Sequence, residues 1–103
     1  MEEYIEKIKE RLRIVSDAFN DEIRALADAC MKDMELSGIY GEISNPLYFQ
    51  AIVLYEKAYF GAGDDTEKMQ KAYEALKVSM SLAGGYYGQK QDSEADQPGV
   101  QTG

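Results

Sequence analysis

Histidine and tryptophan are absent from this 103-residue sequence, and cysteine occurs only once. Without histidine the chain lacks the usual general base, the partner that activates a serine or cysteine nucleophile, and the imidazole ligand of many metal sites. A single cysteine cannot close a disulfide within the chain, which fits a reducing compartment such as the cytoplasm. We therefore expect no enzymatic activity, no cofactor and no metal site.

Basic residues are scarce as well. The chain has 11 Lys and Arg residues against 19 Asp and Glu residues, which gives a formal net charge of −8 at pH 7. The basic residues are scattered, whereas tight binding of nucleic acid by phosphate neutralisation needs them clustered. The sequence therefore argues against a protein that holds DNA or RNA, but not against one that DNA passes without sticking.

Long apolar runs are also missing. None approaches the roughly 20 residues that span a membrane, and the charged first residues, MEEYIEKIKE, do not resemble a signal peptide. The hydrophobic fraction of 45% is ordinary for a folded domain and allows a modest core at this chain length. We expect a single soluble, intracellular domain with no membrane association.

What the sequence does contain is apolar residues spaced by three and four in four segments, as in amphipathic helices. The predicted helices cover about residues 2–14, 20–37, 46–60 and 66–82. Their predicted ends are the N-cap Asn20, the stop Gly38, the N-cap Asn45 before Pro46, the stop Gly61, the capping pair Asp64 and Glu67, and the stop Gly84–Gly85. No strand pattern is visible. The predicted fold class is all-α, a bundle of four main helices in residues 1–88 followed by a flexible, acidic and disordered C-terminal tail, residues 89–103.

The second predicted helix raises the question of chemistry, because residues 19–39 hold five carboxylates and Cys30. At about 100° per residue, Cys30 falls on the apolar side with Ile23 and Met34, while the charged residues fall on the other side. We expect Cys30 to pack as a small hydrophobe and the acids to form a solvated face. The apolar stripes of the first and fourth helices are Ile5, Ile8, Leu12 and Val15, and Met69, Tyr73, Leu76 and Met80.

The third predicted helix is apolar nearly all round. Between residues 47 and 60 only Gln50, Glu56 and Lys57 are strongly polar. Such a helix lies either at the centre of the fold or against another subunit.

Tyrosine supplies eight of the eleven aromatic residues. Its large apolar ring and polar hydroxyl suit surfaces that become dry only on assembly. Tyr48, Tyr55 and Tyr59 share a face of the third helix, where they are either core residues or interface residues. We predict interface roles for Tyr40, Tyr86 and Tyr87, which lie in glycine-flanked segments. Ile39 and Ile43 join them as interface candidates, because a solvated loop seldom carries such large apolar side chains.

Three segments taken together, IKERLRIVSDAFNDEIRALADACMKDMELSGI, NPLYFQAIVLYEKAYFG and KMQKAYEALKVSM, resemble a known family. Their order and spacing are similar to those of the small head–tail connector proteins of tailed bacteriophages and prophages, also described as head-completion or DNA-packaging proteins. The resemblance covers about residues 8–82.

The resemblance implies an all-helical structural subunit that assembles with copies of itself into a ring. The ring would dock beneath the portal protein of the filled capsid and bind a tail-side connector or stopper protein. DNA would pass through its channel without specific binding, and an acidic channel wall would repel the phosphates. The implied location is the head–tail junction of the virion, and the bacterial cytoplasm before assembly. No catalysis is implied.

Two other functions remain open at the level of sequence. A small helical prophage-encoded regulator or inhibitor would bind one partner protein as a discrete complex. An enzyme or metal protein of a helical family would show turnover or bound metal.

Overall fold

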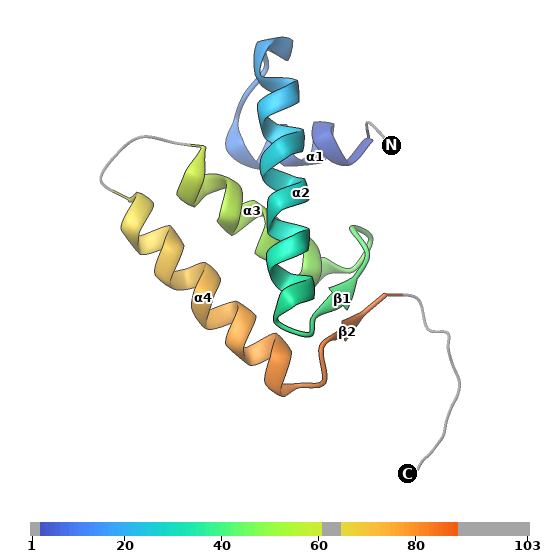
Figure 1. Ribbon diagram of the computed structural model, residues 1–103. Helices are drawn as coiled ribbons and strands as arrows, with labels where there is room; N and C mark the ends of the chain where they lie inside the picture. Colours follow the sequence, from blue (N-terminus) through green and yellow to red (C-terminus); the bar gives the residue numbers. More distant parts are fainter. Residues whose placement is uncertain (1–2, 61–64, 89–103) are drawn as a thin grey trace.

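A computed structural model of the chain describes residues 3–60 and 65–88 (Figure 1). Four helices dominate it: α1 (Glu3–Leu12), α2 (Asn20–Leu36), α3 (Pro46–Tyr59) and α4 (Thr66–Leu82). A single 3₁₀ turn, η1 (Asp17–Phe19), precedes α2, and two very short strands, β1 (Tyr40–Gly41) and β2 (Tyr86–Tyr87), follow α2 and α4. The all-α prediction is confirmed. The predicted tail, residues 89–103, lies outside the described residues, as do Gly61 and Asp64.

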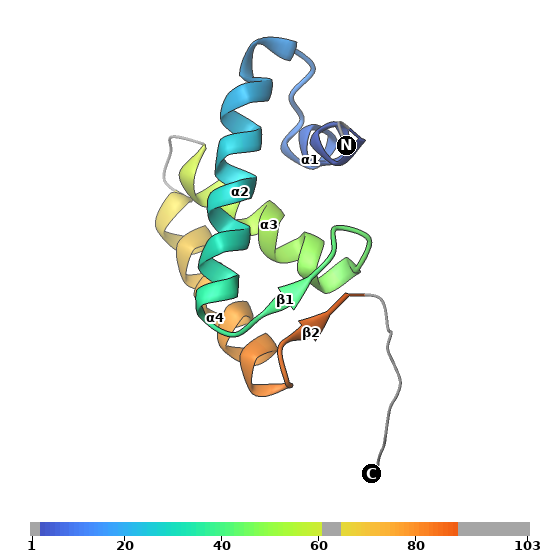
Figure 2. The same ribbon diagram turned by 45° about the vertical axis from the view of Figure 1, so that its right-hand side comes forward.

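Helix α3 is the centre of the fold. It packs most extensively on α4, then on α2, and also contacts α1 (Figures 1 and 2). Ala51, Ile52 and Val53 are fully buried. The apolar sequence of this helix allowed a place at the centre of the fold or against another subunit. The structure shows it at the centre of the fold. The largest fully buried apolar side chains of the core, Ile52 of α3 included, are Tyr73, Ile5, Ile8, Ile23, Met34, Ile39, Ile52 and Met80.

Several predicted helix ends are confirmed. The Asn45 side chain accepts hydrogen bonds from the backbone N–H groups of Leu47 and Tyr48 at 3.0 and 3.2 Å, and Pro46 occupies the first turn of α3. Because the first N–H groups of a helix have no partner within it, this side chain supplies one. Gly38, after α2, has the left-handed φ of +83° that glycine adopts readily.

The start of α2 differs from the prediction. Asn20 is not an N-cap but the first helical residue, with φ −58° and ψ −41°. Ser16 caps the 3₁₀ turn instead, accepting a hydrogen bond from the backbone N–H of Ala18 at 3.0 Å. The turn runs directly into α2, so the backbone is already helical at Asn20. The side-chain Oδ1 of Asn20 is buried without a hydrogen-bond partner.

Helix α1 is shorter than predicted. It ends at Leu12 because Arg13 takes a left-handed φ of +63°. The turn moves Val15 out of the predicted apolar stripe, and its side chain is 97% exposed. Lys9 is buried instead, and its ammonium group donates to Asp17 at 2.6 Å, which ties α1 to η1.

The β1–β2 pair contradicts the expectation of a chain without strands. Tyr40 pairs with Tyr86 and Gly41 with Tyr87 in a parallel register. The backbone N–H of Tyr40 donates to the carbonyl oxygen of Gly85 at 2.6 Å, and that of Glu42 to Tyr87 at 3.0 Å. The pair fastens the segment after α2 to the segment after α4 (Figure 2).

Within the described residues no helix is long and apolar enough to cross a membrane.

Candidate functional site

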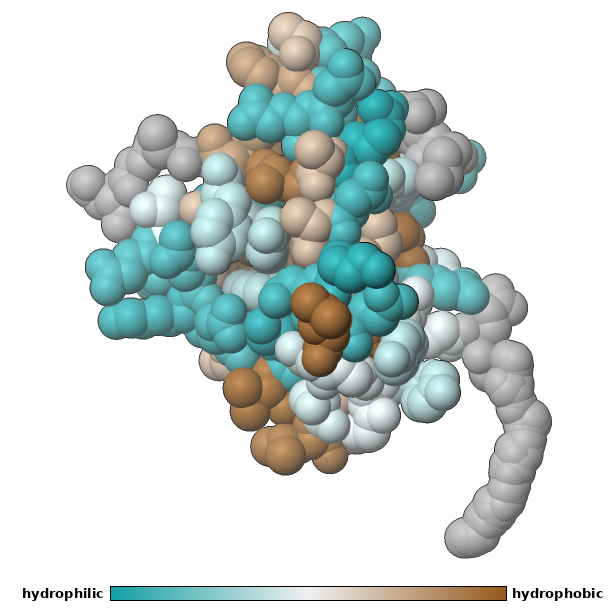
Figure 3. Space-filling model, in the orientation of Figure 1, coloured by the Kyte–Doolittle hydropathy of each residue, from teal (hydrophilic) through white to brown (hydrophobic). Residues whose placement is uncertain are grey.

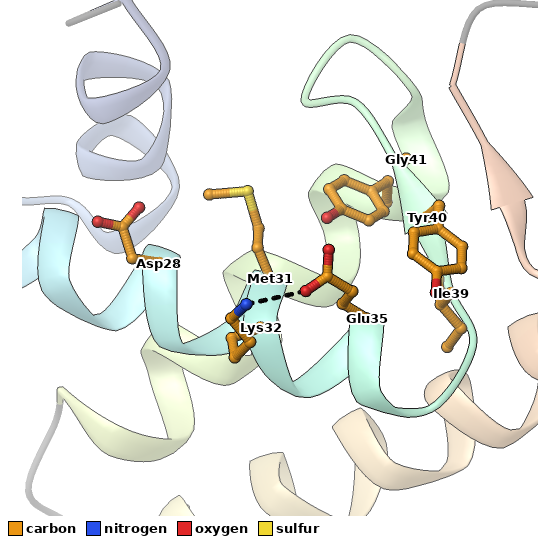
Figure 4. Close-up of a pocket in the computed structure, with 8 residues that line it drawn as sticks. Asp28, Met31, Lys32, Glu35, Ile39, Tyr40 and Gly41 are labelled. Carbon is orange, nitrogen blue, oxygen red and sulfur yellow. Dashed lines mark hydrogen bonds and ion pairs between the residues drawn. The ribbon is translucent and has the colours of Figure 1, made fainter.

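A groove of about 350 Å³ lies between the outer face of α2 and the β1 segment. Four α2 residues form one side: Asp28, Met31, Lys32 and Glu35. Ile39, Tyr40, Gly41 and Tyr48 form the other side and the floor. Figure 4 shows the α2 side chains aligned along one edge of the groove, with Tyr40 and Gly41 opposite. We name this feature the α2–β1 groove.

Two glycines allow β1 to lie where it does. A Cβ atom on Gly85 would overlap the carbonyl oxygen of Gly38, and Gly85 has a left-handed φ of +78°. A Cβ atom on Gly41 would overlap the ring of Tyr48. The close approach of these backbone segments therefore depends on glycine at both places. The tyrosine ring of the groove floor sits against β1 for the same reason.

Tyr40 and Tyr86 form an aromatic pair on the β1–β2 bridge. Their ring centroids are 6.1 Å apart, within the 4.5–7 Å range typical of favourable aromatic pairs. Tyr40 is 48% exposed and Tyr86 82% exposed. The pair thus presents two rings to solvent next to the α2–β1 groove.

The charges of the groove are two carboxylates and one ammonium group. Lys32 donates to Glu35 at 2.9 Å, and this hydrogen bond is the main cause of the raised pKa of Lys32. Asp28 is exposed one helical turn before Lys32. The formal charge of the lining is therefore negative. Burial raises the pKa of Tyr48 to about 12, so its hydroxyl is neutral at the groove floor.

The other predicted interface residues differ in burial and position. Ile39 and Tyr48 are buried in the core of the single chain, and Ile43 and Tyr87 pack partly against it. The rings of Tyr55 and Tyr59 lie on α3, away from β1, with centroids 4.5 Å apart and planes tilted by 43°, and only Tyr59 is exposed. The structure therefore brings together Ile39, Tyr40, Tyr48 and Tyr86 and leaves the Tyr55–Tyr59 pair apart.

Cys30 lies in the core, as predicted. Its thiol faces the carbonyl oxygen of Ala51 at 3.9 Å and the hydroxyl of Tyr73 at 3.8 Å. Burial raises the pKa of the thiol to about 12. A thiol with this pKa is almost entirely protonated near neutral pH, and the protonated form is a poor nucleophile.

A polar cluster next to Cys30 joins α2 to α4. The Tyr73 hydroxyl donates to Asp33 Oδ2 at 2.6 Å, and Lys77 Nζ donates to the same oxygen at 2.8 Å. Burial opposes ionisation of Asp33, but the hydrogen bonds from Lys77 and Tyr73 outweigh it and hold the pKa of the carboxyl below its usual value. The cluster is satisfied internally, which suits a structural role.

Glu56 is the residue that sequence reasoning missed. It is fully buried in α3, and neither carboxylate oxygen has a hydrogen-bond partner. Burial, with a smaller effect of the negative charge of Glu22, raises its pKa to about 8. The sequence signal for this residue was an acid in a helix that is otherwise apolar almost all round. A carboxyl buried in such surroundings is neutral at neutral pH.

The described residues contain no group of three or more metal-ligating side chains that could hold an ion. Comparisons of the chain with models of protein families, with curated proteins and with solved structures find no match.

Proposed function

We propose that this chain is a non-catalytic structural subunit that works by contact with other protein chains. One observation carries the proposal: large apolar side chains remain in solvent where α2 and α4 end and where β2 begins. Leu36 is 80% exposed, Leu82 84% and Tyr86 82%, and Val78 lies beside Leu82. In Figure 3 brown side chains appear in the lower part of the molecule, with teal and white residues between them. Contiguous exposed apolar patches mark protein interaction sites, and Val78 and Leu82 line one surface hollow here.

The resemblance to phage head–tail connector proteins gives this role a setting. In that setting copies of the chain form a ring beneath the portal protein, and a tail-side connector or stopper protein binds the other face. The net charge of −8 supports passage of DNA without retention, because an acidic wall repels phosphates. The location is the head–tail junction of a tailed phage or prophage particle.

Electron microscopy of the chain mixed with the portal protein of the same phage or prophage tests the proposal. A closed ring of copies on the portal is the expected result. A discrete complex with one copy bound to a single other protein, and no ring at any concentration, would favour the regulator or inhibitor instead. Enzymatic turnover that is lost in Cys30→Ser would contradict a structural role.

A further inference from the structure

We propose that the α2–β1 groove is a receptor for one basic side chain, an arginine foremost, projected by a protein partner. The inference rests on the protein-binding role proposed above, but it does not require a ring. Its starting point is the combination of a concave site, an apolar floor and acidic groups on one rim. None of these features alone would identify the occupant.

The size of the groove suits a single long side chain. Its volume of about 350 Å³ is near the lower end of the range of roughly 300–1,000 Å³ that is typical of small-ligand pockets. A partner helix or strand would need a longer channel. One extended side chain, entering between α2 and Tyr40, can be accommodated in such a space (Figure 4).

The floor suits the aliphatic stem of arginine. Met31 offers partly exposed thioether surface, and beneath it lie the buried side chains of Ile39 and Tyr48. Long basic side chains bury their methylene groups on such surface while the charged end stays at the rim. Tyr40 also lines the groove, so an aromatic ring is within reach of the cationic end, and such cation–aromatic contacts are favourable.

The rim selects the sign of the charge. Asp28 and Glu35 lie seven residues apart on α2, about 10 Å along the helix axis, with Lys32 between them. The Lys32–Glu35 ion pair is well exposed, with side chains 69% and 49% accessible, so it holds Glu35 only weakly. A planar guanidinium can therefore share the Glu35 carboxylate with Lys32 and form paired hydrogen bonds with it.

Other occupants fit less well. A phosphate or another anion would meet two carboxylates and only one ammonium group, so the net charge of the rim opposes it. A purely apolar side chain would remove water from the carboxylates of the rim without forming a hydrogen bond to them, which is unfavourable. These two occupants are the competing outcomes of the test.

The test is an NMR titration of the ¹⁵N-labelled chain with the peptide acetyl-Gly-Arg-Gly-amide. Three comparison ligands are acetyl-Gly-citrulline-Gly-amide, in which the arginine is replaced by a neutral group of the same shape, acetyl-Gly-Leu-Gly-amide, and inorganic phosphate. We expect saturable shifts of the amide signals of α2 and β1, with dissociation in the millimolar range for a single side chain. Citrulline should bind about tenfold more weakly, because its neutral group loses the charge-assisted hydrogen bonds.

Two double variants distinguish specific binding in the groove from non-specific attraction of a cationic peptide to a negatively charged protein. In Asp28→Asn/Glu35→Gln we expect affinity for the arginine peptide to fall about tenfold. The control Glu10→Gln/Glu67→Gln also removes two negative charges from exposed helix positions, but away from the groove, and should leave the affinity unchanged. Circular dichroism checks that both variants fold.

Equal binding of the arginine and citrulline peptides would overturn the proposal. So would stronger binding of the leucine peptide or of phosphate, an equal loss in the control variant, or no saturation at tens of millimolar peptide. None of these results depends on assembly. If no ring forms but the titration is positive, the proposal of an arginine-binding groove is therefore supported and the proposed connector function is rejected.

Discussion

Glu56 is the most unusual single residue of the chain, because its carboxyl is fully buried and its oxygens have no hydrogen-bond partner. A charged carboxylate in that position would be strongly unfavourable, so the folded protein keeps the group neutral up to about pH 8. In the unfolded chain the same group ionises near its ordinary pKa of 4.5. Between these two values the folded state binds one proton more than the unfolded state.

This difference predicts how stability depends on pH. The contribution of Glu56 to the free energy of unfolding should fall by about 1.4 kcal/mol per pH unit as pH rises between the two pKa values. Glu56→Gln removes the titration, so the gap between wild type and variant should change with pH at that slope. Urea unfolding from pH 5 to pH 8 measures it. The exposed control Glu67→Gln should run parallel to wild type, and a parallel Glu56→Gln curve would contradict the neutral buried carboxyl.

Cys30 gives a second prediction for a single residue. Because the thiol is buried and its pKa is raised to about 12, iodoacetamide should modify the folded protein very slowly at pH 8. Mass spectrometry follows the reaction. Modification should become fast in denaturant, where the pKa returns to about 8.5. Rapid modification of the folded chain would show that the thiol is open to solvent.

At the scale of the elements, sequence and structure agree where a signal is local. Asn45 and Pro46 mark the start of α3, and glycines follow the ends of α2 and α4, because each acts on the backbone within one turn. Asn20 failed as a predicted cap because Ser16, four residues earlier, already starts a helical turn. The β1–β2 pair joins residues that are far apart in the chain, and no local sequence pattern predicts it.

The candidate site shows the same division. Tyrosine frequency and glycine-flanked positions pointed to Tyr40 and Tyr86, but not to their contact with each other. The groove combines α2 residues that the helical periodicity placed on a solvated face with Ile39 and Tyr48 from beyond the helix. Only the tertiary arrangement of α2, β1 and α3 makes the face concave.

The bridge itself can be tested with adjacent glycines. Gly85→Ala places a Cβ atom against the carbonyl oxygen of Gly38, whereas Gly84→Ala, also at a left-handed φ, meets nothing within 4 Å. Both should be strained, but Gly85→Ala should lose about 1–3 kcal/mol more because of the overlap. Thermal unfolding measures the loss, and amide exchange at Tyr40 reports the bridge. Equal losses in the two variants would mean that the bridge does not depend on this close contact.

At the scale of the whole molecule, the core is built around α3 while its outer ends remain partly uncovered. The central helix packs on α1, α2 and α4, which bury Ala51, Ile52 and Val53 within a single copy of the chain. Large apolar groups are exposed where α2 and α4 end and where β2 begins, among them Leu36, Leu82 and Tyr86. Folding and association should therefore be separable by mutation.

That separation predicts the behaviour of Tyr40→Ala. The side chain is 48% exposed and its main aromatic contact is with Tyr86, so its removal should leave the unfolding temperature nearly unchanged. Association with other copies or with a partner should weaken. A large fall in the unfolding temperature would assign Tyr40 to the core of the single chain.

Sedimentation velocity over a wide concentration range, with and without the portal protein, tests the central claim most directly. The claim predicts that the wild-type chain sediments faster as concentration rises or when the portal is added. Leu36→Ser/Leu82→Ser should weaken that association, and Ala25→Ser/Ala75→Ser, on exposed helix positions elsewhere, should not. A strict monomer at every concentration, alone and with the portal, would contradict a chain that functions through contact between proteins.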